Sequence, residues 1–201
     1  SGAEIILAFK GFAMWGVFDI VKEYIRGAAA SSINEARLCF EEIGLPAHTY
    51  SVVFKEKEFP TVLKYSSHVT FNSIQQYRKY YDRIKINPSV ISPGLRINPE
   101  FSEISYSLYN PSSPGSRLGV SAGELEEDFP EGVEGLHFHV LFESDSYALE
   151  KLLKAVEAKF GRFLERVKWI NMGGGHLITG KKYNADHLIE LIKDFRNRTG
   201  L

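Results

Sequence analysis

The chain has 201 residues, of which 44% are hydrophobic and 24% are charged, and its formal net charge is −1. This length is sufficient for a sizeable core, and the balanced charge gives no electrostatic reason to expect nucleic acid as a partner. No apolar stretch approaches the roughly 20 residues that a membrane-spanning helix needs. The single cysteine, Cys39, excludes an internal disulfide and favours a reducing compartment, so we expect a cytoplasmic protein.

Short apolar runs alternate with helical stretches along the chain. The apolar runs predict seven strands, at residues 5–10, 27–30, 48–53, 68–72, 93–97, 135–142 and 168–172. A predicted helix follows each strand, at residues 17–25, 33–43, 59–64, 73–81, 122–128, 147–166 and 185–199. For the last helix, Asn184 can cap the first turn and Gly200 can end it.

This alternation predicts an α/β fold made of parallel β/α units. Seven units favour a (β/α)8 barrel over an open doubly wound sheet, with residues 1–201 as one incomplete barrel domain. A complete barrel has eight strands and typically about 250 residues, so we expect one strand to be missing.

The first predicted strand ends in Lys10, after the apolar run Ile5-Ile6-Leu7-Ala8-Phe9. A buried ammonium is costly, and a lysine that loses its proton can attack a carbonyl and form a Schiff base. The alternative is a lysine that caps the strand in solvent, because lysine is rarely fully buried. The pattern therefore predicts a strand that delivers an amine to a pocket, with the solvated cap as the other interpretation.

The seventh predicted strand leads directly into Gly173, Gly174 and Gly175. Consecutive glycines permit unusual dihedral angles and close backbone approach, so several N–H groups can converge on one anion. A flexible turn is the alternative. Because ligands bind at the carboxyl ends of parallel strands, we favour a phosphate site. A lysine and a phosphate cradle together suggest pyridoxal phosphate.

Two histidines, His137 and His139, alternate along the sixth predicted strand and so share one face. They could be metal ligands of a hydrolase, although a catalytic zinc usually has three protein ligands. Alternatively, His139 stacks on a flat cofactor while His137 lies deeper in the barrel, or both are core histidines. Arg96 ends the fifth strand and could pair with a carboxylate or phosphate, or form a salt bridge at the rim. Glu143 is the candidate contact for a cationic substrate.

Several motifs together resemble carboxynorspermidine/carboxyspermidine decarboxylase, a bacterial polyamine enzyme family related to ornithine and diaminopimelate decarboxylases. The resemblance covers nearly the whole chain, with the motifs in the family's order. They are Ile6-Leu7-Ala8-Phe9-Lys10-Gly11-Phe12-Ala13, Leu95-Arg96-Ile97-Asn98, Leu108-Tyr109-Asn110-Pro111, Ser116-Arg117-Leu118-Gly119, Glu134-Gly135-Leu136-His137-Phe138-His139 and Trp169 through His176.

The resemblance implies a pyridoxal 5′-phosphate enzyme with an alanine-racemase-like barrel that decarboxylates a small polyamine precursor, as a homodimer. It implies that Lys10 holds the cofactor covalently and that His139 stacks on its ring. It further implies that the three glycines bind the phosphate and that Arg96 lies near the ring. The protein would supply orientation and electrostatics, while the cofactor supplies the chemistry.

The chain also departs from the family's pattern. Phe142 and Ser112 stand where members usually carry cysteine. Family segments that we expect to be missing are the one before the first strand, the eighth strand with its Glu-Pro-Gly-Glu sequence, and the C-terminal β domain. We therefore expect the chain alone to bind cofactor poorly and to show little or no turnover.

Three functions remain open at this point. The first is the polyamine-type decarboxylase or a related pyridoxal phosphate amino-acid decarboxylase. The second is a metal-dependent hydrolase that uses His137 and His139. The third is a non-catalytic chain that associates through an exposed strand edge.

Overall fold

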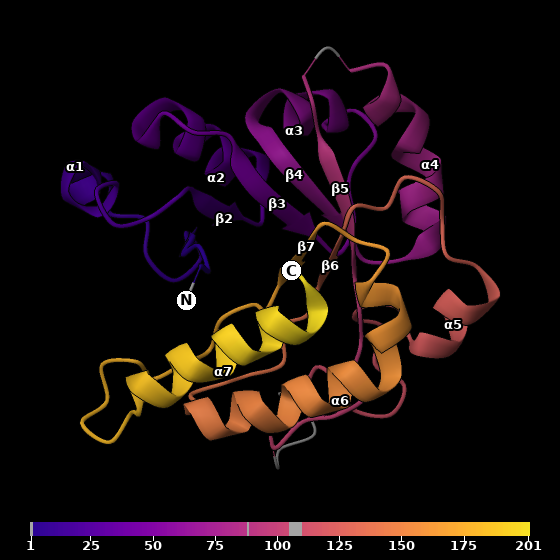
Figure 1. Cartoon of the computed structure of the whole chain (residues 1–201). Coiled ribbons are helices and arrows are strands. Elements are labelled where there is room, and N and C mark those ends of the chain that lie inside the picture. The colour runs from indigo at the N-terminus through magenta and orange to yellow at the C-terminus, as the bar shows by residue number, and fades with distance from the viewer. Residues whose placement is uncertain (1, 88, 105–109) are drawn as a thin grey trace. The chain divides into compact units, whose positions relative to one another are not determined.

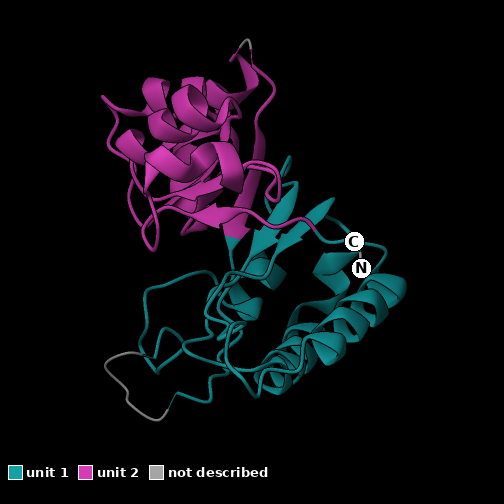
Figure 2. Ribbon diagram, turned by 90° about the vertical axis from the view of Figure 1, so that its left-hand side faces the viewer, with its two compact units in different colours: residues 1–3, 96–201 teal, residues 4–95 magenta. Residues whose placement is uncertain are grey.

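The structure is a computed structural model that describes residues 2–87, 89–104 and 110–201. Within these ranges, seven strands alternate with helices in the order that the sequence predicted (Figure 1). The chain divides into two compact units, shown in different colours in Figure 2. The N-terminal unit comprises residues 4–95, and the C-terminal unit comprises residues 96–201 together with residues 2 and 3. The prediction of one barrel domain stays a prediction.

The N-terminal unit contains strands that pair in chain order, and every pair is parallel. The register joins Ala29 to His48 and His48 to His68, for example. The strands are β1 (Leu7–Ala8), β2 (Ala28–Ala30), β3 (Ala47–Ser51), β4 (Ser66–Phe71) and β5 (Ser92–Arg96), the last of which ends in the C-terminal unit. The helices are η1 (Trp15–Val17), α1 (Phe18–Val21), α2 (Ile33–Leu38), the π-helix η2 (Cys39–Ile43), α3 (Phe59–Tyr65) and α4 (Ile74–Lys85).

Small residues let α2 and η2 pack closely on the first strands of this unit. Ala28, Ala30 and Ala47 from the strands and Ala36 and Cys39 from the helices all have 0–1% of their surface exposed. Burial of this apolar surface stabilises the unit by roughly 25 cal/mol per Å² removed from water. A second part of the core is aromatic and consists of Phe54, Phe59, Phe71, Tyr77 and Tyr80.

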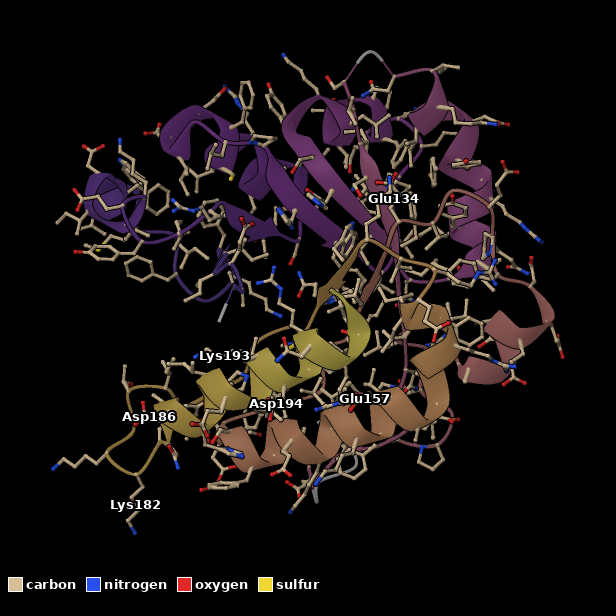
Figure 3. All side chains as sticks on the ribbon, viewed as in Figure 1. Glu134, Glu157, Lys182, Asp186, Lys193 and Asp194 are labelled. Atoms are coloured by element: carbon tan, nitrogen blue, oxygen red, sulfur yellow. The ribbon has the colours of Figure 1, made fainter. Side chains whose placement is uncertain are left out.

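The C-terminal unit contains the strands β6 (Gly135–His137) and β7 (Trp169–Asn171) and the helices α5 (Ala122–Glu127), α6 (Ser146–Leu164) and α7 (Ala185–Thr199). β6 and β7 are parallel, and His137 is paired with Asn171. α6 and α7 lie side by side (Figure 3). Arg198 of α7 forms a bidentate ion pair with Glu157 of α6 at 2.8 and 3.1 Å. A residue larger than glycine at 135 would meet the ring of Trp169.

The predicted helix ends of α7 are confirmed. The side chain of Asn184 accepts a hydrogen bond from the N–H of His187, and Gly200 ends the helix in the left-handed region with φ of 78°. The first and sixth strands end earlier than predicted, β1 at Ala8 and β6 at His137. Among the described residues, no helix combines the length and apolar character needed to cross a membrane.

The N-cap of α4 gives a test of local stability. The hydroxyl of Ser73 accepts a hydrogen bond from the N–H of Gln76 at 3.2 Å. We expect Ser73→Ala to lower the free energy of unfolding by about 1 kcal/mol, because one N–H of the first turn loses its partner. Ser73→Gly is the control, since glycine at an N-cap costs only a few tenths of a kcal/mol. Urea denaturation followed by circular dichroism measures both, and equal values would contradict the cap's role.

Candidate active site

The three glycines after β7 form a turn whose shape only glycine permits at two positions. Gly173 has φ of +71° and Gly175 has φ of +107°. A Cβ at 173 would lie 2.6 Å from the carbonyl oxygen of Phe138, and one at 175 would lie 2.1 Å from that of Leu141. Nothing lies within 4 Å of a Cβ at Gly174, which is exposed. The turn is therefore tight on one side and open at its middle residue.

Hydrogen bonds fix this turn against the end of β6. The N–H of Gly173 donates to Oδ1 of Asn171 at 2.8 Å, and the N–H of Gly174 donates to Nδ1 of His139 at 3.2 Å. The carbonyl of Gly175 accepts from the N–H of Ser144 at 2.8 Å. The N–H groups of Gly173 and Gly174 thus both have acceptors within the chain, and these bonds hold the turn in a defined conformation beside the imidazole of His139.

His139 lies just beyond β6 and is half-buried. Because Nδ1 accepts from a backbone N–H, the proton of the neutral ring is on Nε2. The carbonyl of His139 accepts from Nη2 of Arg96 at 3.1 Å, and Arg96 is 5% exposed. The structure thus brings together Arg96, His139 and the glycine turn, as the sequence predicted from their common place at strand ends.

His137 is buried at the last position of β6, where Nδ1 lies 3.2 Å from the carbonyl oxygen of Asn171. Burial, with smaller contributions from the charges of Arg96 and His139, lowers its pKa to about 3. The ring is therefore neutral at neutral pH, and Nδ1 is the donor to the carbonyl. This placement agrees with the interpretation that His137 lies deeper than His139.

The predicted strand 135–142 was too long. The structure ends β6 at His137 because the chain after it turns to pack on the glycine turn, with the carbonyl of Leu141 beside Gly175. The metal-site alternative loses support at His139, whose Nδ1 accepts from the N–H of Gly174, so that the proton of the neutral ring is on Nε2. Among the described residues there is also no group of three or more His, Cys, Asp or Glu residues able to hold a metal ion.

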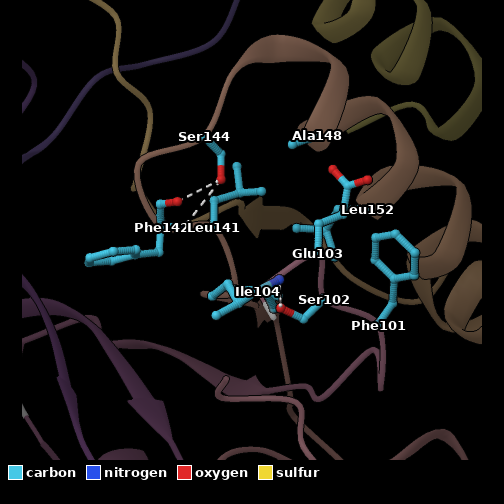
Figure 4. A pocket seen from close by; sticks show the side chains of 10 residues that line it. Phe101, Ser102, Glu103, Ile104, Leu141, Phe142, Ser144, Ala148 and Leu152 are labelled. Carbon is cyan, nitrogen blue, oxygen red and sulfur yellow. Dashed lines mark hydrogen bonds between the residues drawn. The ribbon is translucent and has the colours of Figure 1, made fainter. Parts of the chain in front are cut away.

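Glu143 lies in the loop between β6 and α6, is exposed, and has the unusual positive φ of 46° for a residue with a side chain. Next to it, Phe142 and Ser144 line a cavity of about 300 Å³ (Figure 4). Leu141, Ala148 and Leu152 make this cavity largely apolar. The hydroxyl of Ser144 donates a hydrogen bond to the carbonyl of Phe142 at 2.9 Å. Strain of this kind at a non-glycine residue is common near functional sites.

The long polar segment after β5 is bound to α6. Glu100 and Glu103 pair with Lys159 and Lys151 of that helix at 2.9 and 2.5 Å. The segment returns to the sheet at Val120, whose N–H donates to the carbonyl of Arg96 at 2.8 Å. Leu108 and Tyr109 of the predicted motif lie outside the described residues, whereas Asn110 and Ser112 belong to a turn within it.

Lys10 belongs to the N-terminal unit and lies in a turn after β1, where it is exposed. The expectation of a buried strand that runs to residue 10 was wrong. The carbonyl of Ala8 accepts from the N–H groups of Gly11 and Phe12 at 2.9 and 3.2 Å, so the chain leaves the sheet before Lys10. Phe9, not Lys10, points into the core, where it is 3% exposed and stacks on Phe18 at 5.3 Å.

Two features of the site escaped the sequence analysis. One is Asn171, whose side chain binds the turn; an asparagine two residues before a glycine is a known signal for such a bond. The other is the contact between His176 and Tyr183, in which Nδ1 and the phenol oxygen lie 2.7 Å apart. Burial lowers the pKa of His176 and raises that of Tyr183. This contact closes the loop that follows the glycine turn.

Comparisons with known proteins agree with the predicted resemblance. No family model matches the chain. The chain is 43% identical to the carboxyaminopropylagmatine decarboxylase of Synechocystis sp., in an alignment that covers 97% of the chain. It is also 43% identical to the carboxynorspermidine/carboxyspermidine decarboxylase of Campylobacter jejuni, in an alignment that covers 100% of the chain. These alignments cover 50% and 52% of the two relatives, so the chain spans about half of their length. The resemblance to this group of decarboxylases is thereby confirmed.

Solved structures support the same fold. The crystal structure of carboxynorspermidine decarboxylase from C. jejuni complexed with norspermidine superposes with a TM-score of 0.89 at 42% identity. It covers 100% of this chain, which spans 51% of that one. Diaminopimelate decarboxylase from Helicobacter pylori, complexed with L-lysine, shares the fold at a TM-score of 0.73 and 17% identity. The predicted α/β fold of parallel β/α units, typical of this class of decarboxylases, is confirmed.

The glycine turn gives a second prediction. We expect Gly173→Ala and Gly175→Ala each to lower the free energy of unfolding by about 1–3 kcal/mol, because alanine is strained at positive φ and its Cβ meets a carbonyl oxygen. Gly174→Ala is the matched control and should stay within about 0.5 kcal/mol of the wild type. Urea denaturation measures all three. A Gly174→Ala variant as unstable as the other two would contradict the described turn.

The buried imidazole of His137 gives a third prediction, on pH. The pKa of His137 in the folded chain is about 3, below its ordinary value of 6.5, so the unfolded chain takes up the proton more readily. Its stabilising contribution is complete above pH 6.5 and is lost as the pH falls towards 3, by up to about 1.4 kcal/mol per pH unit.

We expect His137→Gln to reduce this pH dependence of the free energy of unfolding, measured by urea denaturation between neutral and acidic pH. Some dependence will remain, because burial also lowers the pKa of His48, to about 4. Identical pH slopes for His137→Gln and the wild type would show that His137 is not buried as described.

Proposed function

We propose that this chain is the cofactor-binding β/α part of a pyridoxal 5′-phosphate-dependent decarboxylase that acts on carboxynorspermidine or carboxyspermidine in polyamine biosynthesis. The observation that carries the proposal is the 43% identity, over 97–100% of the chain, to decarboxylases of these and closely related substrates. The glycine turn beside His139 supports it independently, because its chemistry suits the phosphate of this cofactor.

The geometry of the glycine turn suits a phosphate group. Gly173 and Gly175 can only be glycine, whereas the space at Gly174 is open. An anion can approach the main chain at Gly174 because no side chain is in the way, and it would share the Gly174 N–H with Nδ1 of His139 or take its place as the acceptor. We assign phosphate binding to these three glycines. His139 supplies an aromatic face next to them, and the buried guanidinium of Arg96 fixes the carbonyl of His139 and adds positive charge.

Lys10 supplies the amine for covalent attachment of the cofactor in this proposal. Its place in a turn directly after β1 leaves the side chain exposed and able to meet an aldehyde. Glu143, also exposed, is the candidate for contact with the cationic polyamine part of the substrate. When bound, pyridoxal phosphate supplies the electron sink that decarboxylation requires. The chain's own residues bind the cofactor, orient it and stabilise its negative charge.

The finer parts of the proposal concern assembly and location. The C. jejuni structure is a complex with norspermidine, which supports a small polyamine-like molecule as the ligand class. We propose a homodimer and a cytoplasmic location, as expected from the family resemblance and the lone cysteine. The Synechocystis relative acts, by its name, on carboxyaminopropylagmatine, so this compound is the competing substrate.

The fourth prediction tests cofactor attachment. We expect pyridoxal phosphate to give the protein at its natural length a visible absorbance band, and borohydride reduction to leave the adduct on the peptide that contains Lys10. Lys10→Ala should abolish both signals, because no other lysine is assigned to the site. Lys22→Ala is the matched control, since Lys22 is an exposed lysine of the same unit that pairs with Asp19.

Substrate choice is measured on the protein at its natural length, as carbon dioxide released from carboxynorspermidine, carboxyspermidine and carboxyaminopropylagmatine. Release from either of the first two supports the proposal, and Lys10→Ala should remove it. An adduct on a different lysine, or release from carboxyaminopropylagmatine alone, would refute the assignment of the amine or of the substrate respectively.

A further inference from the structure

Asn171, the last residue of β7, is bound to the site through both its main chain and its side chain. Its carbonyl oxygen accepts from the N–H of Phe138 at 3.0 Å and faces Nδ1 of His137 at 3.2 Å. Its side-chain oxygen accepts from the N–H of Gly173 at 2.8 Å. Asn171 therefore joins the end of β6, at His137 and Phe138, to the glycine turn.

The side-chain bond determines where the next N–H points. With its N–H held by Asn171, Gly173 adopts φ of +71°, and its missing Cβ would lie 2.8 Å from Nδ1 of His139. The following N–H, of Gly174, is then directed at the same ring nitrogen at 3.2 Å. A different conformation at Gly173 would turn the Gly174 N–H away from His139.

We propose that Asn171 is a positioning residue for phosphate recognition: its amide oxygen holds the glycine turn so that the Gly174 N–H stays beside the ring of His139. The inference rests on the proposed function, in which the turn binds the cofactor phosphate and His139 faces the cofactor ring. Asn171 has no contact with the cofactor in this role. It acts by keeping two recognition elements at a fixed separation before the cofactor arrives.

A purely structural role for Asn171 predicts something different. If the bond only stabilises the fold, its loss would weaken the binding of every ligand of the site equally, or would leave the binding of all of them unchanged. If the bond orients the glycine turn, its loss should weaken the binding of pyridoxal phosphate and leave the binding of pyridoxal unchanged. Pyridoxal has the same aldehyde and ring but lacks the phosphate. The ratio of the two dissociation constants therefore separates the two roles.

The experiment titrates the protein at its natural length, as the wild type and as Asn171→Ala, with pyridoxal phosphate and with pyridoxal, followed by visible absorbance. We expect the alanine variant to lose about tenfold in affinity for pyridoxal phosphate, the order expected when one hydrogen bond that organises a charged contact is removed, and less than about twofold for pyridoxal. Asn184→Ala is the matched control. It removes the same side chain from the cap of α7 and should leave the ratio unchanged.

A second measurement needs no cofactor. Nuclear magnetic resonance of the ligand-free chain should show the Gly173 N–H protected from exchange in the wild type and in Asn171→Asp, which keeps an acceptor oxygen, but unprotected in Asn171→Ala. Inorganic phosphate should shift the Gly174 amide signal in the wild type and less in Asn171→Ala. If the alanine variant does not fold, Asn171→Ser replaces it, since a shorter hydroxyl makes this bond more weakly and should give an intermediate ratio.

The outcomes separate this inference from the function on which it rests. A wild type that binds neither pyridoxal phosphate nor pyridoxal refutes the proposed function. A wild type that prefers pyridoxal phosphate, with the same preference in Asn171→Ala, refutes only the role of Asn171. Equal weakening of both ligands in Asn171→Ala also refutes it, because the residue would then act on the fold and not on phosphate.

Discussion

The close approach of the main chain after β7 to the main chain after β6 is the constraint on which the site depends. Leu141 packs so tightly on Gly175 that there is no room for a Cβ, and the carbonyl of Phe138 leaves none at Gly173. The N–H of Ser144 also donates to the carbonyl of Gly175. Because the two segments touch, the imidazole of His139 comes within hydrogen-bond distance of the Gly174 N–H. The imidazole of His139 and the main chain of Gly174 thus lie together because their two segments are in direct contact.

The features that the sequence predicted well are those decided by neighbouring residues. The α7 helix is an example, because its cap is a bond from Asn184 to an N–H three residues later and its end is a single left-handed glycine, Gly200. The order of strands and helices follows in the same way from local apolar periodicity. The strand-end positions of Arg96, His139 and the three glycines followed from that order, since parallel strands end on the same side of a sheet.

The features that the sequence did not predict depend on distant contacts. β6 ends at His137, not at residue 142, since the following residues bind the turn after β7. Lys10 is exposed because hydrogen bonds to Ala8 close a turn, which apolar character alone does not reveal. The role of Asn171 needed the position of β6 beside β7, and the attachment of residues 100 and 103 to α6 needed the position of that helix.

Cys39 is the first residue of the π-helix η2 and has none of its surface exposed. Burial raises the pKa of its thiol to about 11, so almost no thiolate forms near neutral pH. Since the thiolate is the reactive species, alkylating reagents and mild oxidants have little to attack in this chain. A cysteine introduced on the surface would therefore be the single reactive thiol of these 201 residues, so one spectroscopic label could be attached to each of the two units in turn.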